Sequence, residues 1–172
     1  MKVFACALAL FLAAVTPGFA APADDVATVL VDVGRKPLTA DSLPGDFARL
    51  THFQRHEANG MVLFTQDAPA DGHVRNAQAQ FDTLGATRPA ADKMPLFSIA
   101  FEMVDQPDFS FDGFAAAMER KLGTPTASSN QSGAVFRTWL LKEPQGRSFT
   151  VARAQGSDNG DMITIVQLVQ SR

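Results

Sequence analysis

The clearest pattern of hydrophobic and polar positions lies in the C-terminal third of the chain, between Leu96 and Val169. Over residues 96–104, a large apolar side chain stands at every second position, beginning with Phe97. A period of two is typical of a strand that lays one face on a core. The sequence therefore predicts a strand over Leu96–Val104 whose inner face carries Phe97, Ile99, Phe101 and Met103.

A helix is predicted directly after this strand, because the apolar spacing changes to three and four residues. Ser110 or Asp112 is suited to cap its first turn, and Gly123 followed by Pro125 is a typical helix stop. The apolar stripe of this helix consists of Phe111, Phe114, Ala115, Met118 and Leu122.

Three more strands are predicted beyond a polar loop at Thr126–Gly133. They are Val135–Leu141, Ser148–Ala154 and Met162–Val169, and the turns between them are short. Short turns join antiparallel neighbours. The expected unit is β-α-β-β-β, with its helix on one face of a four-stranded antiparallel sheet, and the fold class is α+β.

The N-terminal half is less regular, and we expect its strands and a second helix to complete the same domain, spanning residues 21–172. Val26–Val33 is β-branched and apolar nearly throughout, which favours a buried strand, and Thr39–Asp46 reads as a loop. A hairpin is expected to pair Arg49–Arg55 with Met61–Gln66 across Asn59-Gly60, with a short helix around Phe47–Phe53 as the alternative. The stripe Val74, Ala77, Phe81 and Leu84 predicts the second helix over His73–Leu84.

Met1–Ala20 has the composition of a secretory signal peptide. Lys2 supplies the charged start, and Val3–Val15 supplies an apolar run too short to span a bilayer, so no stable membrane anchor is expected. Cys6, the single cysteine, lies inside this segment, which leaves a cysteine-free mature chain. A protein of about 150 residues without disulfides can still bury a sufficient core. The sequence thus indicates a periplasmic or secreted protein.

The composition of the chain argues against some classes of binding partner. The formal net charge is −3 and the basic residues are scattered, which argues against nucleic acid. There is no tyrosine and one tryptophan, whereas phenylalanine occurs 14 times. Tyrosine and tryptophan are the aromatic residues that contact surfaces recruit most often, so a broad aromatic platform is not expected.

No catalytic constellation is identifiable. His52 and His56 are four residues apart, a zinc-binding spacing on a helix, but in a strand they would stand about 13 Å apart. We therefore expect no metal and no cofactor. Ser157-Asp158-Asn159 matches one motif of penicillin-binding enzymes, yet the accompanying Ser-x-x-Lys and Lys-Thr-Gly strings are absent, so a hairpin loop is expected there.

The strand Val135–Leu141 carries apolar groups on both faces, which indicates that the second face of the sheet is also covered. The cover is either the N-terminal half of the chain or a bound partner or apolar ligand. In the second case Arg137, Trp139 and Arg153 are the candidate binding residues.

These observations favour an exported binding, inhibitory or accessory protein, acting on an envelope or extracellular protein. Two alternatives remain open. One is a small hydrolase with dispersed Asp and His residues, and the other is a carrier of a small apolar ligand.

The exported protein is expected to begin at Ala21, because Gly18 and Ala20 provide the small side chains that precede a signal-peptidase cleavage site. Intact-mass spectrometry of the exported product measures this directly. A product that retains Met1–Ala20, or one cut beyond Asp25, would contradict the assignment.

Overall fold

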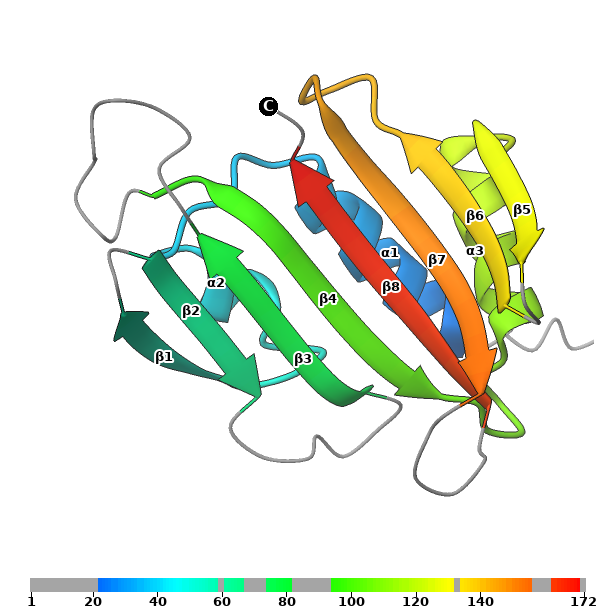
Figure 1. Cartoon of the computed structure of the whole chain (residues 1–172), viewed down its shortest axis with the longest axis horizontal. Coiled ribbons are helices and arrows are strands. Elements are labelled where there is room, and N and C mark those ends of the chain that lie inside the picture. Colours follow the sequence, from blue (N-terminus) through cyan, green and yellow to red (C-terminus); the bar gives the residue numbers. More distant parts are fainter. Residues whose placement is uncertain are drawn as a thin grey trace, which may run out of the picture.

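The computed structural model describes residues 22–58, 61–66, 74–81, 94–131, 134–155 and 162–170. It is an α+β fold in which one eight-stranded antiparallel sheet has its helices on a single side (Figure 1). In chain order the elements are α1 (Pro22–Gly34), α2 (Leu43–Asp46), β1 (Phe53–Ala58), β2 (Met61–Gln66), β3 (Val74–Phe81), β4 (Leu96–Val104), α3 (Phe111–Leu122), β5 (Ala127–Gln131), β6 (Ala134–Leu140), β7 (Arg147–Gln155) and β8 (Met162–Gln170). The expected signal peptide and the Ser157–Asn159 loop lie outside the described residues.

The strand order is β1-β2-β3-β4-β8-β7-β6-β5. Read from either edge, it is a meander of four consecutive strands, and each meander is preceded by a helix, α1 or α3. The last strands of the two meanders, β4 and β8, pair in the middle of the sheet. The chain therefore repeats one topology twice, although its two halves show no repeat in sequence.

The C-terminal unit agrees with the sequence-based prediction in its main elements. The strand Leu96–Val104 and the helix Phe111–Leu122 have the expected bounds. The Gly113 amide donates to Ser110 Oγ at 3.2 Å, and Gly123 ends the helix with a φ of 84°, which disfavours a side chain there. Two expectations were wrong: the Thr126–Gly133 loop contains β5, and the four predicted strands are not a complete sheet but the neighbours β4, β8, β7 and β6 within a sheet of eight.

The prediction of a strand at Val26–Val33 was wrong, because this segment belongs to helix α1. Its apolar side chains are buried on several sides of the helix, which hides the helical period of the hydrophobic residues. The polar residues reveal it instead. Asp25, Thr28 and Asp32 are spaced by three and four, and Asp25 and Asp32 are exposed. Asp24 and Asp25 also lie in the first turn, where negative charge favours a helix.

The helix predicted at His73–Leu84 is strand β3. Its pairing with β4 is irregular between Val74 and Asn76, where the strand carries an extra residue. Val74 and Ala77 therefore face the same side although they are three residues apart, which imitates a helical stripe. Beyond this bulge the buried side chains alternate regularly, from Ala77 to Phe81.

The predicted hairpin before Met61 is confirmed as the pair β1–β2, in which Ala58 lies opposite Met61. Its first strand begins at Phe53, later than expected, and Asn59-Gly60 lies outside the described residues. The region expected as the loop Thr39–Asp46 contains α2, whose Leu43 is buried.

The core lies between the helices and one face of the sheet. Under β1–β4 it contains a group of phenylalanine rings, and α2 lies on this side of the sheet. The Phe47 ring lies 5.2 Å from Phe101 and the Phe64 ring 5.7 Å from Phe81, measured between centroids. Under β5–β8, α1 and α3 pack against one another and against the sheet. Burial of apolar surface on this one side supplies most of the stability of the fold.

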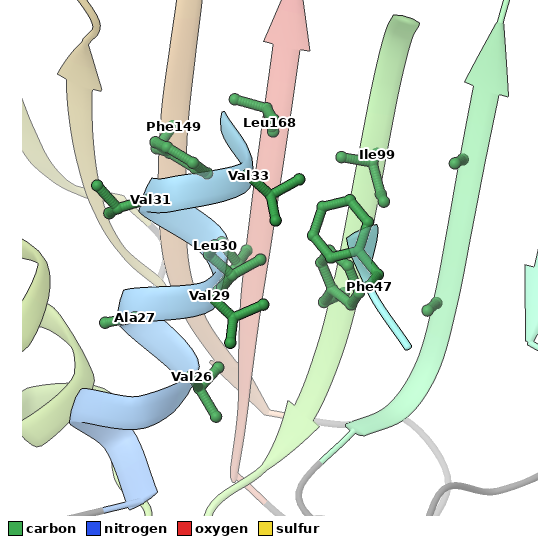
Figure 2. Packing of buried hydrophobic residues seen from close by; sticks show 14 of the residues in the cluster. Val26, Ala27, Val29, Leu30, Val31, Val33, Phe47, Ile99, Phe149 and Leu168 are labelled. Carbon is green, nitrogen blue, oxygen red and sulfur yellow. The ribbon is translucent and has the colours of Figure 1, made fainter. Parts of the chain in front are cut away.

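The C-terminal end of α1 lies close to Phe149 of β7 and Leu168 of β8 (Figure 2). A Cβ placed on Gly34 would lie 2.5 Å from the Phe149 ring, so only glycine fits without a shift. Buried Arg147 of β7 donates to the carbonyls of Gly34 at 2.8 Å and Lys36 at 2.6 Å, and to Gln170 Oε1 at 3.0 Å. Burial lowers the pKa of Arg147, and these acceptors favour its charged form.

Phe114→Ala is expected to lower the free energy of unfolding by about 3 to 5 kcal/mol, because Phe114 is fully buried and its removal leaves a cavity. Lys121→Ala, on the same helix but partly exposed, should cost much less. Urea titration of both variants measures the difference. Equal losses would mean that α3 does not bury the face described.

Candidate functional site

The three predicted binding residues lie on the helix side of the sheet. Arg137 and Trp139 lie on the same face of β6, and Trp139 pairs with the core residue Phe149. Arg153 lies opposite Val135 on the neighbouring strand. Arg137 and Arg153 thus flank Val135 on one surface. Their role in binding remains a prediction.

Trp139 has no surface on which to receive a partner. Its side chain is 1% exposed, and its indole N–H donates to the Gly123 carbonyl at 2.8 Å. A buried indole needs such an acceptor. This bond ties β6 to the end of α3, so the position of Trp139 is explained by packing.

Arg137 and Arg153 are each held by a neighbour. The Arg137 guanidinium lies 5.6 Å from the centroid of the Phe111 ring, within the range of a cation–π interaction. Arg153 lies 3.6 Å from Asp105, and the other oxygen of that carboxylate accepts a hydrogen bond from Thr164 at 3.0 Å. Arg137 also lines a hollow beside β5, whereas Arg153 serves to connect β7 to the end of β4.

Of the two covers considered for the second face, the N-terminal half is not seen there among the described residues. α1, α2 and α3 all lie on the same side, and no described element lies over the opposite side, here termed the open face (Figure 1). Over β3, β4, β7 and β8 the side chains that alternate with the core are small, aliphatic or uncharged polar groups, with one exception. They are Asn76, Gln78, Gln80, Ser98, Ala100, Val104, Ser148, Thr150, Ala152, Ala154, Ile163, Ile165, Gln167 and Val169, and the exception is Glu102.

Glu102 stands near the centre of the open face. It lies opposite Asn76 of β3 on one side and Ile165 of β8 on the other. These three residues, with Gln78 and Ala100, line a hollow of about 260 Å³. Within the described part of the chain, the half-buried Glu102 carboxylate makes no hydrogen bond or ion pair. It is therefore an available acceptor beside two amide side chains, on a floor of alanine and isoleucine.

A larger hollow, of about 590 Å³, lies at the ends of α1 and α3 and includes Arg35, Lys121 and Lys142. Arg35 donates to the Lys121 carbonyl at 3.3 Å. Cations at helix C-termini stabilise the free carbonyls there, so helix capping explains this charge. Leu140 at its rim is 63% exposed.

The segment around the two histidines forms a strand rather than a helix, so the zinc-binding spacing of a helix does not apply to them. His56 lies on β1 with its Nε2 at 3.0 Å from Thr65 Oγ1, and His52 precedes the strand. No group of three His, Cys, Asp or Glu side chains close enough to bind a metal occurs among the described residues. In the same residues, no helix has the length and apolar character needed to cross a bilayer.

The fold is that of an α+β protein whose described helices all lie on one face of the sheet. Comparison with family models, curated proteins and solved structures finds no match to this chain.

The fluorescence emission of Trp139 is expected to be blue-shifted in the isolated protein, because the indole is buried and the sequence contains no other tryptophan. Trp139→Ala should destabilise the protein by about 3 to 5 kcal/mol, as truncation of a core aromatic does. An emission maximum near that of free tryptophan, together with unchanged stability in urea, would place the indole at the surface and contradict this structure.

Proposed function

We propose that the mature chain is an exported binding or accessory protein, periplasmic or secreted, that receives another protein on its open face. The observation that carries this proposal is the Glu102 carboxylate, which has no partner among the described residues, in a hollow whose other lining residues are uncharged. The partner is expected to place a lysine or arginine side chain against Glu102.

The surroundings of Glu102 support a protein partner. Uncharged side chains cost less to desolvate than charged ones, and the partly exposed aliphatic groups of Ile165 and Val104 add apolar area around the hollow. A single carboxylate then contributes specificity, because a partner without a cation would leave it buried and unpaired. Asn76 and Gln78 offer donors and acceptors for the backbone of the partner.

A carboxylate without a second acid, a histidine base or a metal group beside it supports recognition better than catalysis. The residues that line the hollow contain no nucleophile or second ionisable group. Arg75, the extra residue of the bulge next to Asn76, already has an interaction partner. The cation that meets Glu102 is therefore expected to come from another molecule.

The test compares Glu102→Gln and Glu102→Lys with the parent chain in a capture experiment from envelope extract, followed by mass spectrometry and an affinity measurement on the captured protein. Loss of a charge-assisted contact at an interface should weaken binding about ten- to hundred-fold for Glu102→Gln, and charge reversal should weaken it further. Added salt should weaken binding by the parent chain more than by Glu102→Gln.

Glu143→Gln is the matched control, since Glu143 is exposed in the turn after β6, outside the open face. It should bind like the parent chain. If a captured protein binds the parent, both Glu102 variants and Glu143→Gln equally, the open face is not its binding surface.

A further inference from the structure

The two edges of the sheet differ in a way that bears on self-association. β1 carries Arg55, His56 and Glu57, and charges on an edge strand oppose pairing with another chain. β5, at the opposite edge, has the sequence Ala-Ser-Ser-Asn-Gln and carries neither charge nor proline. Its residues Ala127 to Asn130 are exposed. Charged side chains thus protect the edge at β1, whereas β5 carries none.

The hollow beside β5 contains one cation and one anion. It measures about 530 Å³ and is lined by Glu119 from α3, Ser128 and Asn130 from β5, and Arg137 from β6. Glu119 and Arg137 have no ion-pair partner within the described residues. A two-fold interface uses the same patch twice and must complement itself. An uncharged strand flanked by one unpaired charge of each sign meets this requirement.

We propose that β5 is a dimerisation edge, at which two copies of this chain pair their β5 strands antiparallel about a two-fold axis near Ser129. Ser128 then lies opposite Asn130 of the partner subunit. Because the axis runs through the sheet, the helices of both copies lie on one side and the open faces on the other. Glu119 pairs with Arg137 of the partner subunit, and Arg137 with Glu119 of the partner subunit.

This assignment goes beyond the binding function proposed above and does not depend on Glu102. It gives Arg137 a role as an ion-pair partner at the hollow beside β5. The Phe111 ring lies against the Arg137 guanidinium and orients it. A single short edge forms a small interface, so the dimer should be weak.

The experiment is analytical ultracentrifugation of the mature protein over a range from about 1 to 500 µM, a span that covers weak interfaces of this size. We expect a reversible monomer–dimer equilibrium. Ser129→Lys places two like charges side by side at the axis and should weaken dimerisation at least about ten-fold. Gln54→Lys makes the same exposed change on β1 and should have no effect.

Charge reversal tests the ion pairs. Glu119→Arg and Arg137→Glu should each weaken the dimer, and the double variant should recover it, provided that urea titration shows all three folded. The proposal is overturned if the protein stays monomeric throughout the range. That result is expected if the β5 edge instead receives a strand of a different protein. A dimer that Ser129→Lys leaves intact also overturns the proposal. Glu102→Lys should leave the dimer unchanged, so this result is independent of the capture experiment.

Discussion

Helix α1 comes from the N-terminal half of the chain, yet it lies against β7 and β8 of the C-terminal half, and this contact connects the two meanders. Leu30 of this helix is buried, and Gly34, which has no side chain, lets the Phe149 ring contact the backbone of the helix. Arg147 then holds the last carbonyls of the helix with hydrogen bonds from a charged donor. Because every helix is used on this side, nothing remains in the described chain to cover the other. The open face is therefore a direct result of where α1 packs.

Sequence patterns predicted the C-terminal unit well because several local signals agree there. The alternation of Leu96–Val104, the Ser110 cap and the Gly123 stop all depend on residues close together in the chain. α1 was predicted as a strand and β3 as a helix, because tertiary context overrode the local signal. Burial on several sides masks the hydrophobic period of α1, and a bulge shifts the hydrophobic period of β3. β5 was missed because an edge strand with exposed side chains on both faces has no apolar alternation to detect.

The candidate site at Glu102 could not be predicted from the sequence for a related reason. Alternation assigns Glu102 to the face opposite Phe101, but it does not say whether that face is covered. Sequence reasoning named Arg137, Trp139 and Arg153 as the contact residues for the case in which a partner covers the second face of the sheet. The structure instead buries that indole against Gly123 and leaves a surface of small residues exposed. Arg137 is the predicted residue that the geometry still brings to a hollow at the surface.

The strand order also has a consequence for the rate of folding. Each meander joins strands that are neighbours in sequence, so its contacts are local and loop closure costs little entropy. Pairing of β4 with β8, and docking of α1 onto β7 and β8, join segments far apart in the chain. Non-local contacts slow folding. The two four-stranded units can form quickly. Their inner edges, β4 and β8, have no buried core until these two strands pair and α1 docks, which is the slow step. During that interval β4 and β8 present unpaired edges, and their apolar character makes this the stage at which the chain is most exposed to aggregation.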